Sequence, residues 1–169
     1  MRTLGPFIAA MALATAAAAK QADAPIPPGN ASAGAAIVMG KGQCLSCHRI
    51  HGKGSRLGPE LTDIGVNRTP AQLETSLVDP AAEILPENRF YRVVTRDGTS
   101  ITGRLLNHDT FQVLMLDPKE QLRTFMKTDL REHRFVEGST MPSYRSTLSR
   151  QELADVIAYL TTLKGVAPE

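Results

Sequence analysis

The stretch GKGQCLSCHRIHGKG, from Gly40 to Gly54, holds both cysteines of this 169-residue chain. Cys44 and Cys47 are three positions apart, and His48 follows the second cysteine directly. Four kinds of site use two cysteines at this spacing: a disulfide, a zinc site, a redox-active dithiol and a covalently attached haem. The rest of the sequence has to favour one of these four.

The N-terminus predicts an exported protein. Arg2 precedes an apolar run that ends in Ala17, Ala18 and Ala19. The run is too short and too rich in alanine for a membrane span, and its small residues form a typical signal-peptide cleavage site. We therefore interpret residues 1–19 as a signal peptide and the proline-rich residues 20–29 as a flexible leader. The mature protein is expected to be periplasmic or secreted, without a transmembrane anchor.

The composition argues against several functional classes. Lys and Arg number 19 against 17 Asp and Glu, and no basic block stands out, so we expect no nucleic-acid partner. The sequence shows neither a Walker loop nor a dinucleotide-binding fingerprint, and its Ser, His and Asp residues form no hydrolase pattern. Aromatic residues make up 5% of the chain, so a large buried cofactor would add substantially to a small core.

Export and local sequence favour the haem among the four sites. A thioredoxin-like dithiol needs a preceding strand and a parallel sheet, whereas glycine-rich segments flank this motif on both sides. Cys47 and His48 are adjacent and cannot easily share one tetrahedral zinc ion with Cys44. A haem uses each residue separately, because two thiols form thioethers with its vinyl groups and the histidine binds its iron. The motif therefore predicts one covalent haem c; a plain disulfide beside a surface histidine is the remaining alternative.

The patterns around the motif predict helices at both ends and strands between them. Asn30 or Ser32 is a suitable N-cap for a first helix, and Gly54–Arg68 is expected to be a loop. Capping boxes predict two further helices, one beginning at Thr69 and Pro70 with Gln72, and one at Ser149 with Glu152. Alternating β-branched and aromatic runs predict four or five antiparallel strands between Phe90 and Phe135, where Phe111, Val113 and Met115 share one apolar face. The domain organisation we infer is a helical domain over residues 30–89 and 136–165, with a β-rich insertion at 90–135.

Four motifs together resemble a small monohaem cytochrome c of class I type. They are CLSCH (44–48), LGPELTDIG (57–65), STMPSY (139–144) and LSRQELADVIAYL (148–160). In detail the chain resembles the haem-binding domains of planctomycete, verrucomicrobial and acidobacterial secreted proteins, which also carry a β-rich segment before the ligand methionine. The resemblance implies a mainly α, cytochrome c fold. Its N- and C-terminal helices would cross near Gly34 and Tyr159, its loops would wrap the haem, and a small antiparallel β insertion would be added.

The resemblance also implies a role for each matched residue. Cys44 and Cys47 would carry the thioethers, and His48 and Met141 would be the two axial ligands of the iron. Pro59 would offer its carbonyl oxygen to the second nitrogen of His48 and so fix the ring. Met141 lies in an irregular loop, which suits a ligand. The rival ligands are His51, which is too close to His48, and His108 and His133, which we expect to be exposed. Arg56 and Arg68 are candidates for pairing with haem propionates.

These roles imply an electron carrier rather than an enzyme. Iron held by a histidine and a methionine has no free coordination site and can exchange single electrons. The expected partner is another periplasmic redox protein, and the resemblance suggests a quinoprotein or other dehydrogenase. Two alternatives stay open at this point. One is a haem-based sensor or peroxidase-like enzyme with an open or labile distal position; the other is a binding module whose β insertion is the working surface.

Overall fold

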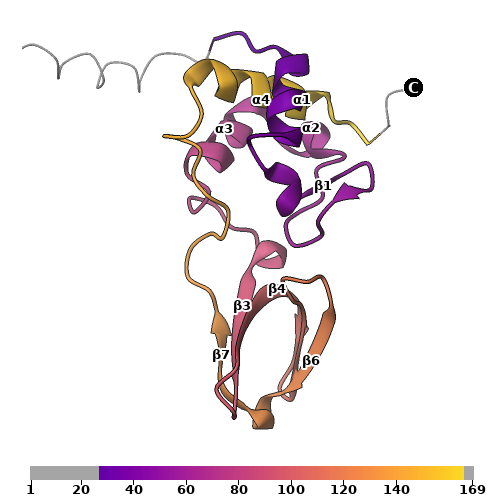
Figure 1. The fold of residues 1–169 in the computed structure, drawn as a ribbon, viewed down its shortest axis with the longest axis vertical. Helices are drawn as coiled ribbons and strands as arrows, with labels where there is room; N and C mark the ends of the chain where they lie inside the picture. Colours follow the sequence, from indigo (N-terminus) through magenta and orange to yellow (C-terminus); the bar gives the residue numbers. More distant parts are fainter. Residues whose placement is uncertain (1–26, 166–169) are drawn as a thin grey trace, which may run out of the picture.

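The computed structural model describes residues 27–165, so the predicted signal peptide and most of the predicted leader lie outside the described residues. Helices gather at one end of the molecule and a curved sheet at the other, with two chain segments running between them (Figure 1). Within the described range, no helix is long and apolar enough to cross a membrane.

Helices α1 (Ala31–Met39) and α4 (Arg150–Thr162) pack closely across each other. The approach depends on Gly34 of α1, because a Cβ atom there would lie 1.9 Å from the backbone oxygen of Asp155. The buried Asp155 carboxylate accepts a hydrogen bond of 2.7 Å from the backbone N–H of Asn30, the residue that caps α1. Glycine is required here by the closeness of the two backbones rather than by an unusual backbone angle.

Both predicted capping boxes are confirmed. Thr69 and Gln72 cap α3 (Pro70–Val78), with Pro70 in the first turn, and Ser149 and Glu152 cap α4 in the same reciprocal way. Each pair satisfies two backbone N–H groups that the helix itself cannot bond.

The segment after the cysteine motif is more regular than we expected. Strands β1 (Arg49–Ile50) and β2 (Lys53–Gly54) form a short antiparallel hairpin, and α2 (Ile64–Asn67) interrupts the predicted loop. His51 has a positive φ of 47° at the turn of the hairpin, a conformation that the sequence did not signal. The motif itself includes a short 3₁₀ helix, η2 (Cys44–Ser46), and another such helix, η3 (Pro86–Asn88), leads into the sheet.

The strands between Phe90 and Phe135 form one antiparallel sheet in the order β6-β5-β4-β3-β7. The strands are β3 (Phe90–Thr95), β4 (Ser100–His108), β5 (Gln112–Leu116), β6 (Leu122–Met126) and β7 (Leu130–Phe135), with the 3₁₀ helix η4 (Lys127–Asp129) before β7. The prediction of four or five strands is therefore confirmed. Because Tyr91 pairs with Phe135, the chain enters and leaves the sheet at neighbouring positions.

The helices and the sheet have separate hydrophobic cores. The helical core joins buried residues of α1, α3 and α4, among them Val38, Leu73 and Val156. The core of the sheet is built on Tyr91, Val93, Val113 and Met115 of β3 and β5, with partly buried apolar residues of β4, β6 and β7 around it. A small sheet is stable in water only when one face is covered, and here the sheet curls to cover its own.

The expected mainly α fold is wrong. Residues 27–165 form a mixed structure of four α-helices, a five-stranded antiparallel sheet and the two-stranded hairpin. The motifs behind this expectation lie in the helical segments before and after the sheet, whereas the segment between them forms a complete sheet with a core of its own. Of the three residues expected to share one apolar face, Val113 and Met115 are fully buried, whereas Phe111, just before β5, is 71% exposed.

Candidate functional site

A single cavity brings the predicted site residues together. It has a volume of about 680 Å³ and lies in the helical part, beside the segments that lead to the sheet. Its walls include the two cysteines, both expected axial ligands and the expected partner of His48: Cys44, Cys47, His48, Met141 and Pro59. The volume falls in the range of about 300–1,000 Å³ that is usual for small-molecule and cofactor sites.

The His48 ring is fixed by a backbone carbonyl. The Pro59 oxygen lies 2.8 Å from Nδ1 of His48, which is the contact that the resemblance implies. A carbonyl oxygen can only accept, so Nδ1 carries the proton and Nε2 keeps a lone pair that can bind a metal. Gly58 allows this approach, because a Cβ atom there would lie 3.0 Å from the imidazole ring.

The electrostatic surroundings keep His48 in the form that can bind a metal. Burial lowers the pKa of His48 below its usual value, the hydrogen bond to Pro59 opposes this change, and the nearby charge of Arg104 lowers the pKa further. The net effect favours the neutral ring.

The two thiols lie on the same wall as His48 and are not joined in a disulfide. Cys44 is half-buried and Cys47 is exposed. Burial raises the pKa of the Cys44 thiol, with a smaller opposing effect from the Tyr144 hydroxyl. In residues 27–165, no three His, Cys, Asp or Glu side chains form a group that could hold a metal ion by themselves.

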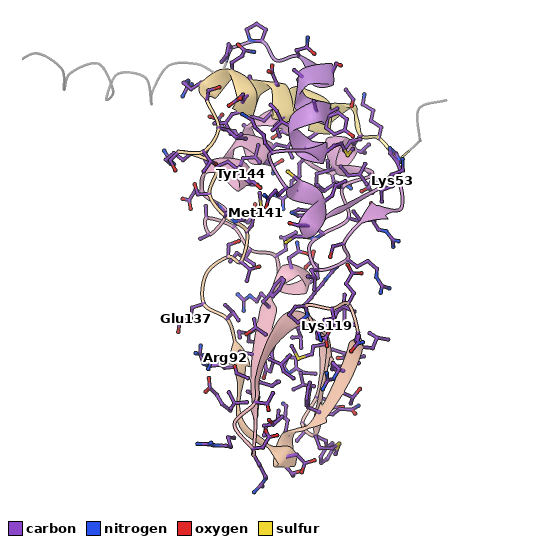
Figure 2. The ribbon with its side chains drawn as sticks, in the orientation of Figure 1. Lys53, Arg92, Lys119, Glu137, Met141 and Tyr144 are labelled. Carbon is purple, nitrogen blue, oxygen red and sulfur yellow. The ribbon has the colours of Figure 1, made fainter. Side chains whose placement is uncertain are left out.

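Met141 lies on a segment that is tied to the helical part at several points. The Ser143 hydroxyl donates to the Val78 oxygen at 2.7 Å, and the backbone N–H of Tyr144 donates to the Leu77 oxygen at 2.8 Å. The Tyr144 hydroxyl then donates to the Gly42 oxygen at 2.5 Å, just before the cysteine motif. These bonds place Met141 in the cavity wall although it is far from His48 in sequence, and Figure 2 shows Met141 and Tyr144 together in the helical part.

The other three histidines lie away from the cavity walls in the described chain. His108 and His133 are exposed, as expected, and His108 is the last residue of strand β4. His133 contacts the Tyr91 hydroxyl at 3.1 Å in the sheet. The half-buried His51 has a buried Nε2 without a partner in the structure. None of the three is therefore placed as a rival to Met141.

The two arginines proposed for haem propionates have different positions. Arg68 lines the cavity and pairs with Glu83 at 2.8 Å, so it is close enough to serve a ligand there. Arg56 pairs instead with Glu120 at 3.2 Å, at the junction with the sheet, and does not line the cavity.

The cavity walls fit a flat, largely apolar ring that carries a metal. Apolar side chains from α3, α4 and the segments beside them line it: Leu61, Ile64, Leu73, Leu77, Ile84, Leu85, Leu148, Val156 and Leu160. Phe90, the first residue of the sheet, adds an aromatic side chain to these walls. A covalently attached haem with histidine and methionine ligands uses two thiols, one nitrogen ligand, one sulfur ligand and apolar contact, and the lining of this cavity includes all four.

Two residues that support the site were not predicted from the sequence. Tyr144 is part of the quoted motif STMPSY, but its hydrogen bond to Gly42 depends on how the chain returns to the cysteine motif. Arg104 lies on β4 and bonds the backbone beside Pro59, a contact between segments that only the fold brings together. The repeated Gly and Pro near position 58 are the one local signal of such a contact.

The chain has no match among models of known protein families and none among curated proteins.

Proposed function

We propose that this protein is an exported c-type cytochrome of mixed α and β architecture that carries single electrons. The observation that supports the proposal best is the joint position of Cys44, Cys47, His48 and Met141 in the walls of one cavity. These residues come from two segments at opposite ends of the sheet-forming region, and a haem is the cofactor whose chemistry uses all four.

Each residue has a defined task in this proposal. Cys44 and Cys47 would hold the cofactor by thioether bonds, and His48 and Met141 would supply the nitrogen and sulfur ligands of its iron. When bound, the haem iron supplies a centre that exchanges one electron between its ferrous and ferric states. Pro59 holds the His48 ring through Nδ1, and apolar side chains line much of the cavity.

The partner we propose is another redox protein in the same compartment, such as a quinoprotein or other dehydrogenase. The exposed Cys47 marks a place where the cavity wall meets solvent. An electron can pass between proteins where a cofactor comes close to the surface. The signal peptide proposed for residues 1–19 would deliver the chain to a periplasmic or extracellular partner.

A redox titration of the exported protein tests the function. We expect a reversible one-electron transition and no change in the reduced spectrum on addition of CO, because both axial positions are filled. A wild-type protein that binds CO readily would instead have an open or labile distal position, and this result would favour a haem-based sensor or a peroxidase-like enzyme.

A further inference from the structure

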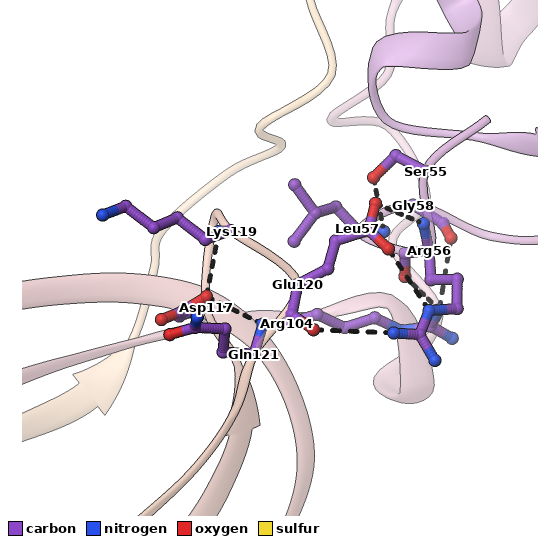
Figure 3. Close-up of polar contacts among 9 residues, drawn as sticks. All are labelled: Ser55, Arg56, Leu57, Gly58, Arg104, Asp117, Lys119, Glu120 and Gln121. Atoms are coloured by element: carbon purple, nitrogen blue, oxygen red, sulfur yellow. Dashed lines mark hydrogen bonds and ion pairs between the residues drawn. The ribbon is translucent and has the colours of Figure 1, made fainter.

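The sheet is joined to the helical part by polar contacts that reach the segment next to His48. Arg104, on the central strand β4, donates from one guanidinium nitrogen to the Arg56 oxygen at 3.0 Å and to the Gly58 oxygen at 3.2 Å (Figure 3). Its own strand is paired on both sides, with Phe90 of β3 and Leu116 of β5 opposite Arg104. The backbone of Arg104 is therefore held by a neighbouring strand on each side.

The segment that Arg104 holds is the one that fixes the His48 ring. The Gly58 N–H donates to the Cys47 oxygen at 2.6 Å, and the next residue, Pro59, offers its oxygen to His48. Residues 56–59 are thus bonded on one side to the cysteine motif and on the other to the sheet. A displacement of this segment would move the carbonyl that orients His48.

A second contact holds the same segment. Glu120 accepts hydrogen bonds from the Arg56 side chain at 3.2 Å and from the Arg56 backbone N–H at 3.3 Å. Glu120 has a positive φ of 59°, in a turn that Asp117 stabilises by accepting from the backbone N–H groups of Lys119 and Gln121 at 2.9 and 3.0 Å. The turn is therefore built to present Glu120 toward Arg56 (Figure 3).

We infer that the five-stranded sheet sets the orientation of His48, and that Arg104 is the positioning residue through which the sheet acts. The inference rests on the proposed function, because it gives the sheet a part in tuning the same haem site. Arg104 acts in two ways: its two hydrogen bonds hold the backbone beside Pro59, and they keep its positive charge next to the segment that bonds the His48 ring. A nearby positive charge favours the reduced site, which carries one positive charge fewer.

The test compares two arginines of the sheet in the full-length, haem-loaded protein. Arg104→Gln removes the positive charge and the guanidinium nitrogen that donates to both carbonyl oxygens. Arg92→Gln is the matched control, because Arg92 lies on the neighbouring strand β3 and bonds Ser100 at 3.1 Å within the sheet. We expect the midpoint potential of Arg104→Gln to fall below that of the wild type, and that of Arg92→Gln to stay with the wild type. Arg104→Lys, which restores the charge, should recover part of the lost potential.

Hydrogen exchange at the Gly58 amide provides a second measurement that does not depend on redox activity. We expect faster exchange in Arg104→Gln and in Arg104→Lys than in Arg92→Gln, because the guanidinium no longer holds both carbonyls. If Arg104→Gln does not fold, the exchange rate of the Gly58 amide in Arg104→Lys tests the positioning role instead.

Different results would overturn the positioning role of Arg104 and the proposed function. A haem-loaded Arg104→Gln protein with the wild-type potential, or an Arg92→Gln protein with the same shift, would overturn the positioning role and leave the proposed function standing. A folded Arg104→Lys protein with wild-type exchange at Gly58 would also overturn the positioning role. A wild-type chain that takes up no haem when exported with its attachment machinery would overturn the proposed function itself.

Discussion

At the scale of single residues, the site depends on backbone groups that hold a few side chains. His48 is oriented by one carbonyl, and the Met141 segment is held by bonds that its neighbours make to backbone oxygens. Backbone partners are fixed by the fold, so they position a ligand more rigidly than a long side chain would. Substitutions at these residues should therefore change the site without unfolding the protein.

Replacement of Met141 by Ala should open one axial position. We expect the reduced Met141→Ala protein to bind CO and its potential to fall, since a thioether ligand stabilises the ferrous state. CO difference spectra and a redox titration measure both effects. Met39→Ala is the matched control, because Met39 is 48% exposed at the end of α1 and should have no effect on either. Equal CO binding by wild type and Met141→Ala would show that Met141 is not a ligand.

Replacement of Tyr144 by Phe should loosen the Met141 segment and alter the pH dependence of stability. The lost bond to the Gly42 oxygen should cost about 1 kcal/mol in the free energy of unfolding. Burial, together with the nearby Cys44, raises the pKa of Tyr144 from its ordinary value of 10.0 to about 12.

Between pH 10.0 and about pH 12, the folded protein keeps a proton at Tyr144 that the unfolded chain has lost. The free energy of unfolding therefore falls as the pH rises. Urea unfolding of the haem-free protein at several pH values measures this decrease. It should be smaller in Tyr144→Phe than in the wild type, and an identical decrease in both would contradict the assigned cause.

At the scale of elements, the contact between α1 and α4 is set by a position without a side chain. Gly34→Ala would place a methyl group against the Asp155 backbone oxygen and the Tyr159 Cβ atom. We expect a loss of about 1–3 kcal/mol in the free energy of unfolding, the usual cost of overpacking. Thermal or urea unfolding measures it. Ser32→Ala, at an exposed position of α1, should stay close to the wild type, and an equally stable Gly34→Ala would disprove the close contact.

The elements also show what the sequence could predict. Capping residues act within a few positions, so the starts of α1, α3 and α4 could be predicted from Asn30, Thr69 and Ser149. The strands followed from alternation and turn residues in the same local way. Two features were missed: the short hairpin after His48, and the exposure of Phe111 just before β5.

At the scale of the whole molecule, the fold class was mistaken because local patterns do not show how much structure a segment builds. The five strands share a core that is separate from the helical one. The residues of the candidate site could be singled out from local motifs, CxxCH and the loop around Met141, and they line one cavity. The contacts of Arg104 with Arg56 and Gly58 could not be predicted, because they join segments that meet only after the sheet has formed.

Two separate cores predict that the helical part can fold without the sheet. The chain enters and leaves the sheet at neighbouring positions, with the Val136 N–H donating to the Phe90 oxygen at 3.0 Å, so a short Gly/Ser bridge can replace residues 90–135. We expect the shortened protein to keep its helical circular dichroism and its covalent haem. A shortened chain that is unfolded would show that the sheet is needed for the helical core.

The most direct measurement is extraction of the purified, exported protein with acidified organic solvent, followed by the intact mass of the polypeptide. If Cys44 and Cys47 hold a haem, the colour stays with the polypeptide and its mass includes one haem. The Cys44→Ala, Cys47→Ala double variant should lose the colour under the same treatment. Colour that leaves the wild-type protein, or a wild-type mass equal to that of the bare polypeptide, would contradict covalent attachment and with it the proposed cytochrome.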